Sequence, residues 1–244
     1  MLLQAEKVAK SFGSFQAVAG ADLIVAQGEI VGLIGPNGAG KSTFFNCLAG
    51  DMQPTAGRIL FDGHDVTHAS PEAHALAGIG RTFQVPATFE DMTVLDNVMV
   101  GAFLRHASRG AARDRALDVI EMTGLKEHAL RRARTLGTPG RKRLEIARVL
   151  ASEPRLMLLD EALAGLTPTE LQLAIELVST IHKAGVTLVI VEHIMEVIMT
   201  LAQRVLVFNQ GHVIASGKPR DIINDPAVVE AYLGHGHARR ARKG

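Results

Sequence analysis

The chain has 244 residues, of which 47% are hydrophobic and 21% charged, and its formal net charge is +1. This length and balance are typical of a soluble globular protein with a well-buried core. The small net charge gives no overall field that would indicate nucleic acid or a membrane surface as partner, and no apolar run approaches the roughly 20 residues of a membrane span. We expect no secretory signal at the N-terminus, and the single cysteine excludes an internal disulfide framework and suits the cytoplasm.

The first part of the chain is predicted to alternate short strands with turns. Apolar residues between glycine- and proline-containing turns predict strands at residues 2–9 (an edge strand), 21–26, 30–34 and 58–62. Residues 10–15 are expected to form a turn, residues 71–78 a short helix and residues 80–84 an extended segment. A helix is also expected after residue 40, and Cys47 on this helix is predicted to be a small core residue.

The pattern changes after Gln84. Thr93, with Asp96 three residues later, is typical of a capped helix start, and apolar residues follow at helical spacing. A second helix is predicted at residues 113–122. Residues 85–150 contain no convincing strand. We therefore expect a helical lobe inserted into an α/β core.

Strands return in the last part of the chain. Residues 156–159 and Thr187–Val191 are short, continuously apolar runs, as buried parallel strands should be. The remaining predicted elements are a helix at residues 168–184, a hairpin at residues 205–215 and a short helix at Pro226–Leu233. The basic residues after position 234 are expected to form a solvated, flexible end in preference to a functional basic patch.

The strongest motif is the glycine-rich stretch at residues 35–43. Four of its residues fit the phosphate-loop pattern G-x-x-x-x-G-K-[ST]: Gly35, Gly40, Lys41 and Ser42. The glycines let amide N–H groups approach phosphate oxygens, and the helix start adds free donors and the positive end of a helix dipole. Lys41 supplies positive charge for the β- and γ-phosphates, and Ser42 offers a hydroxyl to Mg²⁺. The strand before the loop and the helix after it favour nucleotide binding over a chance match.

A second motif follows the apolar run at residues 156–159, which ends in the adjacent carboxylates Asp160 and Glu161. Ligands of parallel α/β sheets lie beyond the carboxyl ends of the strands. We therefore expect Asp160 beside the phosphate loop, where it can hold Mg²⁺, and Glu161 facing the γ-phosphate, where it can orient the attacking water. The alternative is that the two acidic residues cap the next helix. The presence of the phosphate loop strongly favours the nucleotide-site interpretation over this one.

Three further residues are weak signals alone and specific together. Gln84 lies at the start of the helical lobe, His193 follows the strand at Thr187–Val191, and Phe12 precedes the first core strands. A histidine after a strand is more often a helix cap when nothing else is known. In this order and spacing, the motifs resemble those of the ATP-binding subunit of an ABC transporter, over essentially residues 2–233.

The resemblance implies an α/β fold: a P-loop NTPase core with a mixed sheet and helices, an antiparallel β edge subdomain and an inserted α-helical lobe. It implies a single ABC ATPase domain at residues 1–234. Within it, a RecA-like core would cover about 1–84 and 150–234 and the lobe about 85–149, followed by a basic flexible tail at 235–244.

The resemblance also implies the cofactors, ATP and Mg²⁺, and a role for each motif residue. Phe12 would stack on the adenine ring, and His193 would sense the γ-phosphate. The implied catalytic residues are Glu161, His193, Gln84 and Lys41. The implied metal ligands are Ser42, Gln84 and Asp160. The implied nucleotide contacts are Phe12, Gly35, Pro36, Asn37, Gly38, Ala39, Gly40, Lys41, Ser42 and Thr43.

Within the family, the chain is most similar to the branched-chain amino acid importer ATPases. The stretches that carry this similarity are residues 80–84, 92–97, 143–148, 163–168 and 229–234. ATPases of urea importers and lipopolysaccharide exporters share many of these sequence stretches. The resemblance implies hydrophobic permease subunits and a second ATPase subunit as partners, no nucleic acid, and a peripheral place at the cytoplasmic face of the inner membrane.

The chain departs from the family at the signature, usually Leu-Ser-Gly-Gly-Gln, which falls here on Leu136-Gly137-Thr138-Pro139-Gly140. In the family, this loop contacts the γ-phosphate held by the opposite subunit. Gly137 has no hydroxyl and Pro139 has no N–H, although proline is tolerated at a helix start and Thr138 can supply a hydroxyl. The positive run at residues 141–143 is family-like, with a solvated helix start as the alternative interpretation.

Two smaller departures accompany the altered signature. Ala162 replaces the usual proline after Glu161, and Thr167 replaces an Asp or Asn in a loop that crosses the family's dimer interface. The hypothesis that follows is a heterodimer with one strong and one weak site, with a homodimer as the other possibility. A second function class is a regulatory ATP-binding subunit with slow turnover. A translation or DNA-repair protein fits poorly, because the chain has one cassette and no heptads.

Overall fold

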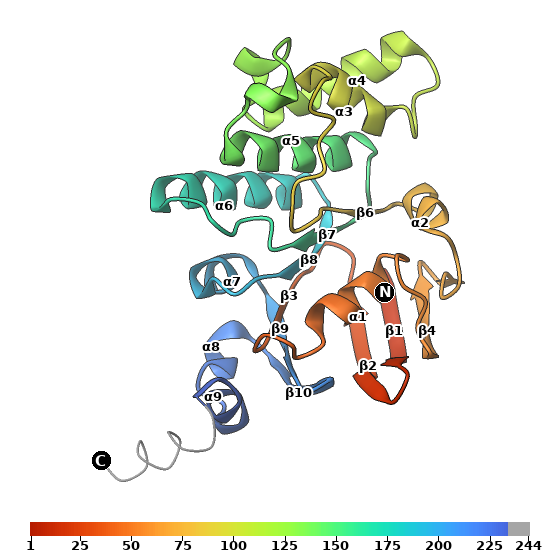
Figure 1. The fold of residues 1–244 in the computed structure, drawn as a ribbon, viewed down its shortest axis with the longest axis vertical. Coiled ribbons are helices and arrows are strands. Elements are labelled where there is room, and N and C mark those ends of the chain that lie inside the picture. Colours follow the sequence, from red (N-terminus) through yellow and green to blue (C-terminus); the bar gives the residue numbers. More distant parts are fainter. Residues whose placement is uncertain (234–244) are drawn as a thin grey trace. The chain divides into compact units, whose positions relative to one another are not determined.

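The computed structural model describes residues 1–233, and the chain forms two compact units (Figure 1). The first unit contains Met1–Pro71 and the segment from Thr187 onward, and the second contains Glu72–Val186. The helical lobe expected at about residues 85–149 falls within the second unit, and its limits stay a prediction. The predicted basic tail at residues 235–244 lies outside the described residues.

The first unit contains an antiparallel sheet, as the predicted fold class requires. Its strands, in the order β2-β1-β4-β5, are β2 (Phe15–Val25), β1 (Leu3–Phe12), β4 (Ala56–Phe61) and β5 (His64–Asp65). The expectation of an edge strand at residues 2–9 is wrong, because β1 pairs with β2 on one side and with β4 on the other. The turn expected at residues 10–15 is shorter, because pairing of Phe12 with Phe15 extends the hairpin to its tip.

A second group of strands in this unit leads to the phosphate loop. The group consists of β3 (Ile30–Ile34), β8 (Thr187–Val191), β9 (Arg204–Asn209) and β10 (His212–Gly217). β3 pairs in parallel with β8 and with β9, while β9 and β10 form the predicted antiparallel hairpin. All residues of β3 and β8 are buried, which explains why both read as continuous apolar runs.

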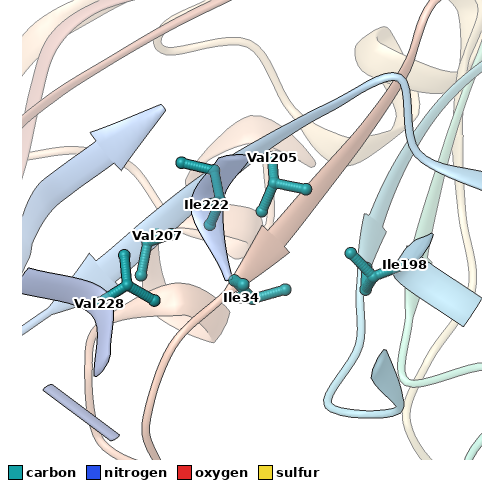
Figure 2. Close-up of a cluster of buried hydrophobic side chains, with 6 residues drawn as sticks. All are labelled: Ile34, Ile198, Val205, Val207, Ile222 and Val228. Atoms are coloured by element: carbon teal, nitrogen blue, oxygen red, sulfur yellow. The ribbon is translucent and has the colours of Figure 1, made fainter. Parts of the chain in front are cut away.

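Four helices of the first unit pack on these strands. They are α1 (Lys41–Leu48), α7 (Met195–Leu201), α8 (Pro219–Ile222) and α9 (Pro226–Leu233). Phe44 of α1 lies against Phe208 of β9, with ring centroids 5.2 Å apart. Cys47 is buried, as expected, and burial raises the pKa of its thiol to about 11. Figure 2 shows a core cluster in which Ile34 meets side chains from α7, α8, α9 and β9.

The second unit contains a parallel strand pair and most of the helices. The strands are β6 (Ile79–Arg81) and β7 (Leu156–Asp160). The helices are α2 (Pro71–Ala77, beginning at the unit boundary), α3 (Val94–Ala102), α4 (Arg109–Met122), α5 (Thr138–Ala151) and α6 (Pro168–Lys183). Between β6 and β7 the described chain contains helices and no strand, as predicted, apart from one isolated bridge between Thr93 and Arg132.

Local sequence signals explain where these helices begin. The Thr93 hydroxyl accepts the Asp96 N–H, which confirms the predicted cap of α3. α4 begins four residues earlier than predicted, because the Ser108 hydroxyl accepts the Ala111 N–H and starts the helix at Arg109. Among the described helices, none is long and apolar enough to cross a membrane.

Candidate functional site

The phosphate loop connects β3 to α1 in the first unit, and neighbouring backbone encloses two of its glycines, Gly35 and Gly40. Gly35 has a φ of 148°, and a Cβ atom there would lie less than 3.0 Å from the Phe208 carbonyl oxygen. Gly40 has a φ of 101°, and a Cβ atom there would lie equally close to the Ala17 carbonyl oxygen. Both positions therefore need glycine for their backbone angle and for the close approach of another strand.

Lys41 covers this loop from the first turn of α1. Its side chain is buried, and Nζ donates to the carbonyl oxygens of Gly35 at 2.7 Å and Pro36 at 2.9 Å. The helix begins without a side-chain cap, so its positive end meets the loop directly, and the following residue, Ser42, is exposed. A phosphate anion placed on this loop would meet an ammonium group and a helix N-terminus together.

Two further predicted residues, His193 and Phe12, also lie in the first unit. β3 and β8 run in parallel with Leu33 opposite Val191, so His193 lies two residues beyond the end of the strand beside the phosphate loop. Ile194 is the N-cap of α7, so His193 lies directly before the helix. Phe12 ends β1 with 48% of its surface exposed, and the Lys10 Nζ lies 5.4 Å from its ring centroid. Such a ring has a face open for stacking on a purine.

In the second unit, Asp160 is the last residue of β7 and is almost fully buried. Its backbone N–H donates to the Thr82 hydroxyl at 3.2 Å, and its carboxylate lies 3.6 Å from the Arg81 guanidinium. Sequence reasoning missed both partners, although they stand in the stretch 80–84 that indicated the family. The expected position of Asp160 beside the phosphate loop stays a prediction.

Glu161 is held by two side chains of the second unit. Its φ of 46° lies in the left-handed region, which costs a non-glycine residue about 1–3 kcal/mol. The Gln84 Nε2 donates to its carboxylate at 2.8 Å, and the Lys142 Nζ donates to its carbonyl oxygen at 3.2 Å. The structure therefore brings the predicted pair Gln84 and Glu161 together. The alternative interpretation of residues 141–143 as a solvated helix start is wrong for Lys142, because this side chain is buried and contacts Glu161.

Glu145 on α5 holds the segment that contains Gln84, and sequence reasoning missed this role. Its side chain is only 2% exposed, and Oε1 accepts the backbone N–H groups of Phe83 at 3.2 Å and Ala87 at 3.3 Å. Burial raises the pKa of the Glu145 carboxyl, while the two N–H groups and the nearby Arg148 and Lys142 act in the opposite direction. The sequence signal that could have identified Glu145 was the position of an acidic residue among the apolar residues Leu144, Ile146 and Ala147.

The altered signature forms the exposed start of α5. Leu136 is buried, whereas Gly137 and Thr138 are exposed. Gly137 is the N-cap of α5 with φ −66° and makes no side-chain hydrogen bond. A Cβ atom at Gly137 would meet only the Pro139 Cδ, at 3.8 Å. The missing hydroxyl is therefore a local change at an open position.

Thr167, the other departure, has a local structural role. Its hydroxyl accepts the Glu170 N–H at 3.4 Å, and the Glu170 carboxylate accepts the Thr167 N–H at 2.8 Å. These reciprocal bonds form a capping box at the start of α6. The Thr167 N–H, followed by the hydroxyl, lowers the pKa of the Glu170 carboxyl. Thr167 thus serves helix initiation in this chain.

Comparison with known proteins agrees with these motifs. Residues 18–164 match the ABC transporter family, and residues 212–238 match a segment described as branched-chain amino acid ATP-binding cassette transporter. The chain therefore belongs to the ABC transporter family. Its activity is that of the ATP-binding subunits of this family, ATP hydrolysis coupled to transport.

Relatives with described functions are similar along nearly the whole chain. The high-affinity branched-chain amino acid transport ATP-binding protein LivG of Salmonella typhimurium is 38% identical, with 96% of this chain and 98% of the relative covered. The corresponding protein BraF of Pseudomonas aeruginosa is 37% identical with the same coverage. The chain is thus most similar to branched-chain amino acid transport ATPases.

Solved structures give the same result for the fold. A nucleotide-free ATP-binding cassette from an ABC transporter matches with a TM-score of 0.87 and 30% identity, covering 96% of this chain and 99% of the other. A dimeric bacterial ABC transporter cassette matches with a TM-score of 0.81 and 26% identity, covering 90% of this chain and 99% of the other. These likenesses confirm the α/β P-loop NTPase fold expected from the sequence.

Proposed function

We propose that this chain is the ATP-hydrolysing subunit that powers an ABC importer for branched-chain or other amino acids. Its similarity to LivG and BraF over 96% of the chain supports this cargo class. The match of residues 212–238 to a branched-chain amino acid transporter segment also supports it. ATPases of urea importers and lipopolysaccharide exporters are the alternatives for the cargo.

ATP binding is assigned to the first unit. Amide groups of the phosphate loop and the Lys41 ammonium would hold the β- and γ-phosphates, since Lys41 already lies over the loop carbonyls at hydrogen-bond distance. Phe12 would stack on the adenine ring, and His193, beyond the neighbouring strand, would contact the γ-phosphate. The assigned loop contacts are Gly35, Pro36, Asn37, Gly38, Ala39, Gly40, Lys41, Ser42 and Thr43.

Hydrolysis is assigned to Glu161, and one observation carries the assignment. The Gln84 amide donates to the Glu161 carboxylate at 2.8 Å. This hydrogen bond orients the carboxylate directly after the end of the buried strand β7. In this role the carboxylate accepts a proton from the attacking water and orients it toward the γ-phosphate. The Lys142 contact fixes the backbone from which this carboxylate projects.

Mg²⁺ fits the donors that the motifs supply. The Asp160 carboxylate, the Ser42 hydroxyl and the Gln84 amide oxygen are hard oxygen ligands of the kind this ion prefers. Because Gln84 uses Nε2 toward Glu161, its amide oxygen is the atom left to serve as a ligand. When bound with the nucleotide, Mg²⁺ supplies charge neutralisation at the phosphate oxygens.

The partners in this proposal are permease subunits and a second ATPase subunit, with a heterodimer favoured over a homodimer. Exposed apolar side chains near Gln84, at Phe83, Val85 and Phe89, offer a docking surface for a permease. The chain would then lie at the cytoplasmic face of the inner membrane. The helical lobe at about residues 85–149 would be the part that faces the partner subunits.

Replacement of Glu161 by Gln tests the hydrolytic role. We expect ATP hydrolysis and amino acid transport in reconstituted vesicles to fall by on the order of 100-fold or more, with ATP binding retained. Glu176→Gln, at an exposed position of α6, is the matched control and should change neither. A regulatory subunit with slow turnover would instead leave transport almost unchanged in Glu161→Gln.

The altered signature motivates the heterodimer. The exposed start of α5 lacks a side-chain hydroxyl at position 137, so it offers a partner's nucleotide one donor fewer. Hydrolysis by the purified chain alone should therefore be slower than hydrolysis by the chain mixed with its partner ATPase. Equal rates per competent site would rule out the asymmetric arrangement, while the ATPase assignment would stand.

A further inference from the structure

Arg81 is the last residue of β6, and its guanidinium faces the carboxylate assigned to Mg²⁺. β6 pairs in parallel with β7, with Arg81 opposite Leu158, so Asp160 lies two residues further along the neighbouring strand. The Arg81 guanidinium lies 3.6 Å from the Asp160 Oδ2. Both residues belong to the second unit, and no motif of the sequence assigned Arg81 a role.

This ion pair is nearly closed to solvent. The side chain of Arg81 is 14% exposed, and that of Asp160 is 10% exposed. A charged carboxylate in such a place needs a positive partner, because water no longer compensates its charge. Salt in the solvent also screens a buried pair far less than an exposed one. The guanidinium therefore acts on Asp160 as a fixed countercharge.

Two further contacts hold the guanidinium beside Asp160. The Arg81 Nε donates to the Thr82 carbonyl oxygen at 3.3 Å, and the Arg81 Cζ lies 4.5 Å from the Phe83 ring centroid. Thr82 is itself fixed, since its N–H donates to the Leu158 carbonyl oxygen at 2.9 Å and its hydroxyl accepts the Asp160 N–H at 3.2 Å. Backbone and side-chain contacts thus place the positive charge of β6 beside the negative charge of β7.

Close packing also fixes the backbone from which Arg81 projects. A Cβ atom at Gly80, the residue before Arg81, would lie 2.5 Å from the Val149 Cγ1 and 3.3 Å from the Pro154 Cβ. β6 is therefore held against α5 and the turn that follows it, and the guanidinium has a firm base.

We propose that Arg81 is a positioning residue that occupies the Asp160 carboxylate before metal binding and so sets the Mg²⁺ concentration that the chain requires. The inference rests on the proposed role of Asp160 as a Mg²⁺ ligand. A guanidinium and a divalent cation attract the same carboxylate and repel each other, so Asp160 can ligate the metal only if its ion pair with Arg81 weakens. The phosphates of a bound nucleotide add negative charge that favours the metal in this competition. Arg81 therefore makes metal binding depend more strongly on the nucleotide.

Mn²⁺ is a stand-in for Mg²⁺ whose binding to the full chain can be followed by electron paramagnetic resonance. With saturating ADP, Arg81→Met should lower the Mn²⁺ dissociation constant about 3- to 10-fold, because the competing charge is gone. Arg81→Lys keeps a positive charge and should stay within about 2-fold of the wild type. Arg105→Met is the matched control, since the Arg105 guanidinium donates to the carbonyl oxygens of Leu76 and Ser152 in the same unit, and it should leave the constant unchanged.

The thermal midpoint of the nucleotide-free chain tests the ion pair itself. Arg81→Met takes the guanidinium away from a buried carboxylate, so the midpoint should fall by about 6–12 °C. Addition of Asp160→Asn to this variant should recover about half of the loss, because an amide needs no countercharge. A loss that Asp160→Asn does not reduce would assign the effect to the packing of Arg81 and overturn the inference.

Phe83→Leu keeps the experiment decisive if Arg81→Met does not fold. This variant removes the ring beside the guanidinium at an exposed position and retains both charges. A guanidinium that is held less firmly competes less well, so the Mn²⁺ dissociation constant should fall about 2-fold. An unchanged or higher constant in Phe83→Leu would then overturn the inference.

The outcomes separate this inference from the proposed function. A wild-type chain that binds no Mn²⁺ in the presence of ADP would overturn the proposed metal role. A wild-type chain that binds Mn²⁺, together with an unchanged or higher dissociation constant in Arg81→Met, would overturn the role of Arg81 alone. An equal decrease in Arg105→Met or Arg81→Lys would also overturn it, because the effect would then not depend on the charge beside Asp160.

Discussion

The helices α1 and α5 both begin at a glycine without a side-chain cap, yet their surroundings differ. Gly40, before α1, has a φ of 101° and lies against the Ala17 carbonyl oxygen of β2. Gly137, before α5, has a φ of −66° and meets only the Pro139 Cδ at 3.8 Å. The first glycine is required by its backbone angle and by the neighbouring strand. The second occupies an open position that other residues can adopt.

This difference shows that the phosphate loop and the start of α5 tolerate substitution to different degrees. The phosphate loop is held by backbone groups of neighbouring strands, which no single side-chain change can replace. The start of α5 is open at Gly137, so a different residue there would meet no neighbouring backbone within 4 Å. The chain combines a complete phosphate loop with an altered signature.

Gly40→Ala is the variant that tests the difference between Gly40 and Gly137 most strongly. The added Cβ would meet backbone that cannot move aside, at a φ that L-residues avoid, so we expect a loss of about 4 kcal/mol in the free energy of unfolding and loss of ATP binding. Denaturant unfolding and nucleotide titration measure both. Gly137→Ala is the control and should cost about 0.5 kcal/mol. Similar losses for the two variants would show that the contrast is wrong.

Glu145→Ala tests whether the segment with Gln84 depends on one carboxylate. The variant leaves the N–H groups of Phe83 and Ala87 without their acceptor, so we expect a loss of about 2–3 kcal/mol and a marked fall in ATP hydrolysis. Glu145→Gln keeps an acceptor oxygen for both groups and should retain most of the activity. If both variants retained activity, the segment would be held by something other than Glu145.

The same position predicts a dependence of stability on pH. Burial raises the pKa of Glu145, so the folded state holds the proton more tightly than the unfolded state. The stability contributed in this way is fully present below the unfolded pKa and is lost as the pH rises through the folded pKa. Glu145→Gln does not titrate and should lack this part of the slope. Unfolding curves across the weakly acidic range check it, and parallel slopes would contradict it.

Thr167→Ala should have a smaller effect, because the capping box stabilises one helix start. We expect a loss of about 1 kcal/mol in the free energy of unfolding. Thr169→Ala, two residues further along and outside the cap, is the matched control and should cost less than half as much. A larger loss in Thr169→Ala would mean that the capping box is not the feature that stabilises α6.

Gly137→Ser should have the smallest effect on stability and a useful effect on activity. The extended backbone at this position suits a serine N-cap, and the Gly140 N–H is the available donor because Pro139 has none. We expect a gain of about 0.3–0.5 kcal/mol and faster ATP hydrolysis by the chain alone. An unchanged rate would indicate that the missing hydroxyl does not limit the site.

Short-range patterns in the sequence predicted much of the fold and of the candidate site. Thr187–Val191 and Pro226–Leu233 have the bounds expected from their apolar runs and flanking residues. The cap at Thr93 and the helical segment that follows Gln84 were also expected. The edge position of residues 2–9 was wrong, because pairing with both β2 and β4 depends on segments that no local pattern describes.

By itself, the sequence determined the kind of protein and the positions of its motifs, because glycine spacing and strand-end carboxylates are local features that the chemistry of phosphate binding requires. The tertiary structure decided which side chains support these motifs. Glu161 meets Gln84 from 77 residues away, and Glu145 holds the segment of Gln84 from α5. Such hydrogen bonds depend on how distant elements pack, and local propensity carries no information about them.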